Sequence, residues 1–218
     1  MKIIKAIVIL FILVSTVTSQ AQKIKPTEVK KVMQRVADWQ IANYEGLYSG
    51  HEKPHHPLDW TNGALYVGMV KWAAMAEDDS YFEWLKEIGT KNDWKLHRRK
   101  YHADDHTVGQ MYIELFRKYK DSTMIEPTIE QFDFIRLHPA QTSLRWKTPY
   151  HQDRWNWCDA LFMAPPVITL LAKHEGREAE YLDEMHRYYQ ETYNLLYDKE
   201  ENLFARDTRY QWTGSTAD

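Results

Sequence analysis

The feature that most limits the fold of this chain is a helical spacing of apolar residues that runs from residue 26 almost to the C-terminus. Apolar side chains that recur every three or four residues indicate amphipathic helices, whereas strands alternate every second residue. The pattern predicts no strand and seven helices: 26–40, 59–77, 79–88, one opened by residues 101–110, 126–137, 160–173 and 181–197. The sequence therefore predicts an all-α fold.

The predicted helices differ in how much of their surface is apolar. The helix at 59–77 is apolar on most sides between Ala64 and Ala76, which favours a position inside the fold. The helix at 79–88 is shorter and amphipathic. Such alternation is what an α/α barrel needs, because there an inner ring of helices is wrapped by an outer ring. The 218 residues are enough for one domain with a sizeable core.

The composition argues against several other classes. A net charge of −3 shows no bias toward nucleic acid or an anionic membrane surface. The single cysteine, Cys158, excludes an internal disulfide and a Cys-based metal cluster. The His-rich loop at 51–57 lacks the spacing of helical metal ligands, and we expect no metal. Nine Trp and 14 Tyr suit a packed helical core or a platform on which rings stack against sugars, and both can apply.

Residues 1–21 have the features of a signal peptide. Lys2 and Lys5 give a basic start, and the apolar run at 6–14 is short for a bilayer span. The small residues of the sequence Ser-Gln-Ala at 19–21 suit a signal peptidase. An N-terminal membrane anchor is the alternative. We expect a mature domain at 22–218 that is periplasmic or secreted.

The segment at 154–167 holds the first candidate for chemistry. Asp159 is a lone carboxylate among two tryptophans, a cysteine, a phenylalanine and a methionine. Burial in apolar surroundings would raise the pKa of Asp159 and keep its proton near neutral pH, as a general acid requires. Alternatively Asp159 caps the following helix, and the two interpretations are compatible. Pro165 and Pro166 predict a kink or a late helix start, because neither has a backbone N–H.

Asp104 and Asp105 form the second candidate. They precede Val108, the first residue of an apolar stripe, by four and three positions. Both acids therefore lie at the head of the inward-facing side of a helix. One Asp can cap that helix, and two adjacent acids exceed the need. The pattern favours a chemical role for one of them.

The run WCDALFMAPP at residues 157–166 resembles the active-site segment of glycoside hydrolase family 105, the unsaturated rhamnogalacturonyl hydrolases. Family 88, the unsaturated glucuronyl hydrolases, is similar. The resemblance covers residues 26–218 in order and includes the sequence DWTNG at 59–63. It implies an (α/α)6 barrel that is incomplete here, with about seven of twelve helices present, so that 22–218 form its N-terminal part.

The resemblance also implies residue roles. Asp159 is expected to be the general acid/base. A second active-site acid is expected in the other segment, where the spacing to Gly109 favours Asp104 over Asp105. Substrate contacts are then expected from five residues: Trp60, Asn62, Asp105, Trp157 and Arg206.

The implied reaction is the hydration of the C4–C5 double bond that a polysaccharide lyase leaves on a terminal uronic acid. Asp159 would protonate C4 and then accept a proton from the water that attacks C5. The hemiketal rearranges and releases a ring-opened sugar. The implied partner is an unsaturated uronate-terminated oligosaccharide, with no cofactor, no nucleic acid and no membrane after signal cleavage. The alternative is an inactive truncated barrel that at most binds sugar.

Overall fold

The computed structural model describes residues 25–44, 54–148, 150 and 152–211, so the predicted signal peptide lies outside the described residues. The chain divides into two compact units, residues 1–43 and 44–218. In the first unit, helix α2 (Pro26–Ala42) confirms the helix predicted from residue 26. Proline is tolerated in the first turn of a helix because the missing N–H would have no intrahelical acceptor there.

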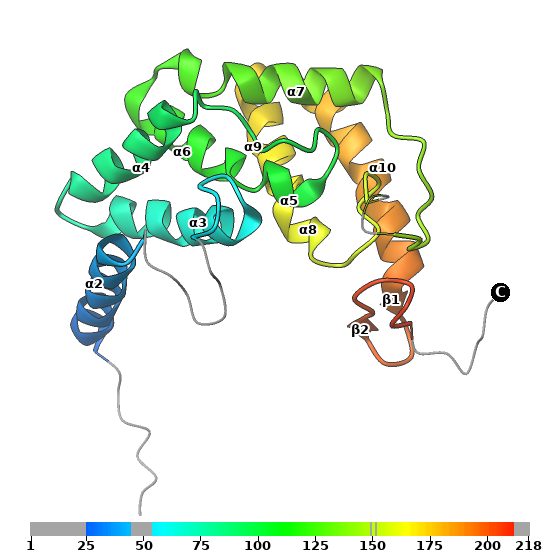
Figure 1. Ribbon diagram of the computed structural model, residues 1–218, viewed down its shortest axis with the longest axis horizontal. Coiled ribbons are helices and arrows are strands. Elements are labelled where there is room, and N and C mark those ends of the chain that lie inside the picture. Colours follow the sequence, from blue (N-terminus) through cyan, green and yellow to red (C-terminus); the bar gives the residue numbers. More distant parts are fainter. Residues whose placement is uncertain (1–24, 45–53, 149, 151, 212–218) are drawn as a thin grey trace, which may run out of the picture. The chain divides into compact units, whose positions relative to one another are not determined.

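The second unit is mostly helical (Figure 1). Its elements are α3 (Trp60–Met75), α4 (Ser80–Lys91), α5 (Ala103–His106), α6 (Gly109–Tyr119), the 3-10 turn η1 (Ser122–Met124), α7 (Glu126–Leu137), α8 (Ala160–Met163), α9 (Pro165–Glu175) and α10 (Glu178–Leu196). The predicted helices are confirmed, and two of them are divided: the one opened at 101–110 into α5 and α6, and the one at 160–173 into α8 and α9.

Helices α3, α6 and α9 form the centre of this unit. Helix α6 contacts α3 on one side and α9 on the other, while α4 packs against α3 and α6, and α10 packs against α9. The side chains of Tyr66, Tyr112 and Leu171, one from each central helix, are fully buried. Burial of such large apolar side chains is the main stabilising contribution to a helical domain. The expected alternation of buried and half-exposed helices is present.

Two glycines allow the starts of the central helices to approach closely. A Cβ atom on Gly63 of α3 would lie 2.9 Å from the Cβ of Thr107, just before α6. A Cβ atom on Gly109 of α6 would lie 2.9 Å from the Cγ1 of Val167 in α9. A larger residue at either position would push the helices apart, because a close-packed interior does not absorb an added carbon at that distance.

The expectation of no strands is wrong in one place. Two-residue strands β1 (Tyr197–Asp198) and β2 (Leu203–Phe204) pair antiparallel after α10, and Trp157 forms an isolated antiparallel bridge with Asp207. Segments this short cannot show a period of two in the sequence. Among the helices of the described residues, none combines the length and apolar character needed to cross a bilayer.

Candidate active site

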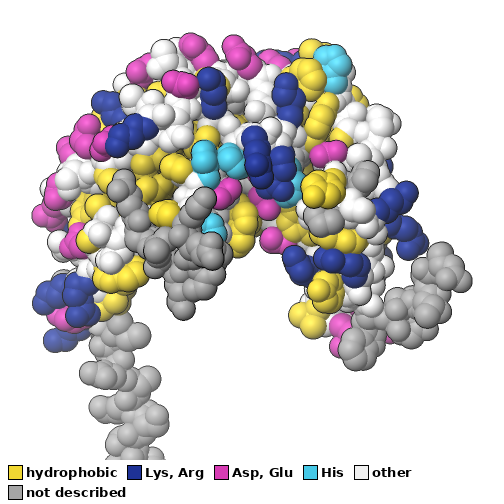
Figure 2. All heavy atoms as spheres, in the orientation of Figure 1, with side chains coloured by type: hydrophobic (Ala, Val, Ile, Leu, Met, Phe, Trp, Pro, Cys, Tyr) yellow, Lys and Arg dark blue, Asp and Glu magenta, His cyan; other side chains and the backbone are white. Residues whose placement is uncertain are grey.

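The predicted site residues other than Arg206 lie at the start of α3 or in the short segments that precede α6 and α9. Asp59 and Asp159 occupy the N-cap positions of α3 and α8, and Asp104 lies in α5, just before α6. Helices α5 and α8 contact each other, as do α3 and α5. Figure 2 shows histidine, acidic and basic side chains beside one another near the middle of one face. The fold therefore brings together acids that are far apart in the sequence.

Asp105 anchors the segment that leads into α5. Its side chain is 1% exposed and accepts hydrogen bonds from the backbone N–H of Arg99 at 2.7 Å and from the Arg99 guanidinium at 2.5 and 3.1 Å. The planar fork of an arginine fixes the orientation of a carboxylate. Both carboxylate oxygens of Asp105 thus have protein donors, which leaves Asp104 as the acid of this pair available for chemistry.

Asp104 is the carboxyl group with the strongly shifted acidity. Burial and then the negative charge of Asp159 raise the pKa of Asp104 to about 7, against the opposing charge of Arg99 and a hydrogen bond from the Trp157 side chain. Within the described residues, the Oδ1 atom of Asp104 is buried and has no hydrogen-bond partner. A buried polar atom without a partner is costly and in native structures often marks a functional group. Asp104 therefore holds a proton close to neutral pH.

The structure corrects the expected burial of Asp159. Its side chain is exposed, although its neighbours Trp157 and Ala160 are buried. It occupies the N-cap position of α8, but within the described part of the chain it makes no side-chain capping hydrogen bond. The physical reason is the turn that precedes a four-residue helix: the backbone turns Trp157 inward and leaves the carboxylate on the surface. Its negative charge still acts on Asp104.

Trp157 belongs to a buried cluster behind the two acids. Its ring lies 4.6 Å from that of His102, and the Nε2 of His102 lies 3.2 Å from the Oε1 of Gln152. Burial and the nearby charge of Arg99 lower the pKa of His102 to about 4, so this histidine is neutral near pH 7. The Nδ1 of His102 lies 3.8 Å from the Oδ2 of Asp104. The cluster thus places a neutral imidazole next to the protonated acid.

At the start of α3, the two residues predicted to reach a sugar differ in exposure. Trp60 is 46% exposed, whereas Asn62 is 6% exposed. The Asn62 amide donates to the carbonyl oxygens of His55 and His56 at 3.4 and 3.0 Å. Asn62 therefore holds the preceding loop, and Trp60 presents an open aromatic face.

Arg206 is brought to the Asp159 segment by the chain after β2. Its carbonyl oxygen accepts the backbone N–H of Cys158 at 2.8 Å. Its side chain is exposed, with the guanidinium carbon 5.7 Å from the centroid of the Tyr210 ring. An exposed cation thus lies beside an aromatic ring in a segment whose backbone is bonded to that of the Asp159 segment.

Several residues of the site were not predicted. His102 lies next to Asp104, Arg99 bonds to Asp105 and Gln152 contacts His102. Gln110 bonds to the carbonyl oxygens of Phe162 and Met163. One signal for His102 was present, because it lies two residues before Asp104. Arg99 acts within the same segment, whereas Gln152 and Gln110 act through contacts with residues 50 or more positions away. Among the described residues, no group of three or more His, Cys, Asp or Glu side chains is arranged to hold a metal ion.

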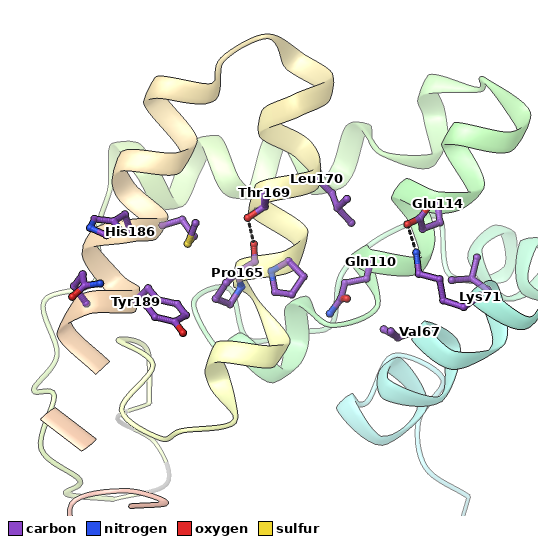
Figure 3. Close-up of a pocket in the computed structure, with 13 residues that line it drawn as sticks. Val67, Lys71, Gln110, Glu114, Pro165, Thr169, Leu170, His186 and Tyr189 are labelled. Carbon is purple, nitrogen blue, oxygen red and sulfur yellow. Dashed lines mark hydrogen bonds and ion pairs between the residues drawn. The ribbon is translucent and has the colours of Figure 1, made fainter. Parts of the chain in front are cut away.

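A groove of about 640 Å³ lies between α3, α6, α9 and α10 (Figure 3). Lys71 and Glu114 form an ion pair of 2.6 Å at its α3 and α6 side. Gln110 lines the groove and points from α6 toward the start of α9. Of the described residues that line it, none is a predicted catalytic acid, so the groove does not include the acid pair.

The helical fold and the coupled carboxylates define a class, an all-α domain with an acid–base site at the ends of its central helices. A family model described as Glycosyl Hydrolase Family 88 matches residues 32–218, and the chain belongs to this family. The resemblance drawn from residues 157–166 is thereby confirmed.

Two curated relatives share the name unsaturated 3S-rhamnoglycuronyl hydrolase. The protein from Formosa agariphila is 39% identical over 207 residues, which are 91% of this chain and 52% of that protein. The protein from Alteromonas sp. is 31% identical over 205 residues, 87% of this chain and 49% of that protein. The chain thus spans about half the length of these relatives.

Among solved structures, a glycosyl hydrolase family 88 protein from Bacteroides vulgatus matches with a TM-score of 0.64 and 21% identity. The match covers 85% of this chain and 53% of that one. At this identity the likeness concerns the fold, and it agrees with the helical barrel fold of the family.

Proposed function

We propose that this chain supplies the acid pair of a hydrolase that removes a terminal 4,5-unsaturated uronic acid from oligosaccharides produced by a lyase. The observation that carries the proposal is the coupling of two carboxyl groups at neighbouring helix starts, where Asp159 raises the pKa of Asp104. Family membership and the names of the curated relatives support the same reaction class.

In this proposal the two acids have different roles, because one is exposed and the other is buried. Asp159 is exposed and faces the substrate: the proton that the pair holds passes from Asp104 to Asp159 and from there to C4, and the water that attacks C5 then returns a proton to the pair. Asp104 is buried behind it and holds a proton near neutral pH. Two coupled carboxyl groups with separated acidities are a common basis for acid–base catalysis. The resulting hemiketal rearranges and releases the ring-opened sugar.

The proposed substrate contacts are assigned from the exposure of each side chain. Trp60 and Arg206 are exposed and are proposed to touch the sugar, Trp60 by stacking and Arg206 through its charge. Asn62, Asp105 and Trp157 are buried with protein partners, and we propose that they support those contacts from behind.

We further propose that the activity belongs to a larger barrel. The curated relatives are about twice as long as the part matched here. Residues 22–218 are proposed to form the N-terminal part of an (α/α)6 barrel, which supplies Asp104 and Asp159. The remaining wall of the sugar site would then come from helices of the kind that complete the fold in the relatives.

The test of the reaction is Asp159→Asn in the full-length protein. Asparagine keeps the shape of the side chain but cannot deliver a proton, so turnover of lyase-generated oligosaccharides should fall on the order of 100- to 10,000-fold. The assay follows loss of the ultraviolet absorbance of the conjugated alkene. Asp93→Asn is the matched control, because Asp93 has a 75% exposed side chain paired with Lys95. Near-normal turnover of Asp159→Asn, or sugar binding without turnover by the unaltered protein, would contradict the proposal.

We propose export as a separate point, based on the features of residues 1–21. The protein is then periplasmic or secreted, and its N-terminus after export should be Gln22 or an adjacent residue. N-terminal sequencing of the exported protein measures this. An intact Met1 in the exported fraction would rule out cleavage.

A further inference from the structure

We propose that Gln110 is a positioning residue for the acid pair, because its amide links the segment that carries Asp159 to the segment that carries Asp104. The inference rests on the proposed function, since it concerns the same two acids. It starts from the break between α8 and α9.

The break leaves two backbone carbonyl groups without helical donors. Pro166 has no N–H and cannot donate to the carbonyl of Phe162, four residues earlier. The N–H of Val167 donates to Ala164 at 3.0 Å and so does not serve the carbonyl of Met163. Backbone carbonyls inside a protein need a donor, since an unpaired one costs about 1–3 kcal/mol.

Gln110 supplies that donor from another helix. Its amide nitrogen lies 3.2 Å from the carbonyl oxygen of Phe162 and 3.4 Å from that of Met163. Gln110 is 8% exposed and sits in the first turn of α6, and Figure 3 shows it reaching toward the start of α9. Thr107 adds a second link, because its hydroxyl lies 2.8 Å from the carbonyl of Asp104 and 2.9 Å from the sulfur of Met163.

These bonds act on Asp159 through the short helix. The N–H groups of Phe162 and Met163 donate to the carbonyl oxygen of Asp159 at 2.9 and 3.3 Å. The peptide group between Phe162 and Met163 is therefore held at both ends, because its carbonyl accepts from Gln110 and its N–H donates to the catalytic residue Asp159. A displacement of about 1 Å at a reacting group can cost on the order of 100-fold in rate.

The first variant is Gln110→Met, which keeps the length of the side chain and removes the donor. In the full-length protein we expect kcat to fall at least about tenfold while KM changes less than about twofold, because the loss is in alignment and not in sugar binding. Gln190→Met is the matched control: Gln190 lines the same groove from α10, and in the described structure neither carbonyl accepts a bond from it. A lower melting temperature with unchanged kcat would mean a merely structural role and would overturn the inference.

The second variant, Pro166→Ala, restores a backbone N–H that can donate to Phe162. In that background Gln110→Met should reduce kcat by less than about threefold, because the carbonyl has regained a helical donor. An equal loss of kcat in both backgrounds would show that the broken helix is not the reason for the effect and would overturn the inference.

The third measurement does not depend on turnover. Asp104 faces Arg99, Asp105 and His102 from its own segment. From the other segment it faces Asp159 and Trp157, of which Asp159 has the larger effect on its pKa.

Because the charge of Asp159 raises the pKa of Asp104, displacement of Asp159 should lower it in Gln110→Met and leave it unchanged in Gln190→Met. Carbon-13 NMR titration of the Asp104 carboxyl measures this. An unchanged pKa overturns the role of Gln110. If the unaltered protein lacks turnover, the proposed function fails, while the titration still decides the role of Gln110.

Discussion

The two acid-bearing segments of the site, residues 97–110 and 154–163, differ in which side chain they bury. In the first, the polar sequence HADDH buries Asp105 completely and leaves the Asp104 side chain 16% exposed. In the second, an aromatic sequence exposes its acid, Asp159. Apolar neighbours in the sequence therefore do not bury a carboxylate, because adjacent side chains at a helix start point in different directions.

The two segments also differ in how they are held. The first is fixed from within, by the bonds between Arg99 and Asp105. The second is fixed from outside: Trp155 has a φ of 54° and its carbonyl accepts the hydroxyl of Thr192 at 2.7 Å, and Cys158 bonds to Arg206. A left-handed backbone at a bulky residue is uncommon and persists only where surrounding contacts enforce it. A rigid buried acid thus lies next to an acid whose position depends on distant residues.

The prediction with the largest expected effect tests whether Asp104 is the buried acid, through the pH dependence of the free energy of unfolding. The pKa of Asp104 is about 7 in the folded chain and near the ordinary aspartate value of 3.8 when the chain is unfolded. Between these values the folded state binds more protons, so the free energy of unfolding falls as pH rises. Asp104→Asn removes this dependence, and from pH 4 to pH 8 the variant should gain up to roughly 4 kcal/mol relative to the unaltered protein.

Chemical denaturation at several pH values measures the difference. Asp93→Asn is the control, since Asp93 has a 75% exposed side chain and its variant should follow the unaltered protein at every pH. Parallel curves for Asp104→Asn and the unaltered protein would show that Asp104 is not the buried member of the pair.

Much of the helical fold could be predicted from the sequence. The apolar spacing is set by residues a few positions apart, and α7 (Glu126–Leu137) has the predicted bounds. The prolines at 165 and 166 correctly indicated an interruption, which is now seen at Ala164 between α8 and α9. The pair β1 and β2 could not be predicted, because two-residue strands depend on a turn and on pairing rather than on a pattern.

The site was less predictable than the fold. That Asp104 and Asp105 lie at an inward-facing helix start followed from their distance to Val108. Their roles differ because their neighbours differ. Asp105 is held by Arg99, whereas the pKa of Asp104 depends on Asp159 and Trp157, which are more than 50 positions away in the sequence. The exposure of Asp159 depends on the end of the short helix α8. Side-chain burial at such a break is set by tertiary contacts, and local hydrophobicity does not determine it.

The smallest expected effect is the change in the free energy of unfolding when Asp159, the exposed acid of the pair, is replaced. Removal of a capping aspartate usually costs about 1 kcal/mol through the lost hydrogen bond. Asp159 is at an N-cap position, but among the described residues its side chain makes no capping bond, so Asp159→Ala should change the free energy of unfolding by less than about 0.5 kcal/mol.

Asp121→Ala is the matched control, because Asp121 accepts the N–H of Thr123 at 3.1 Å as the cap of η1, and it should cost about 1 kcal/mol. Denaturation at pH 5, where Asp104 is protonated, isolates the capping contribution from the charge interaction of the two acids. A loss for Asp159→Ala as large as that for Asp121→Ala would mean that Asp159 supports α8 and would remove the contrast between the two segments.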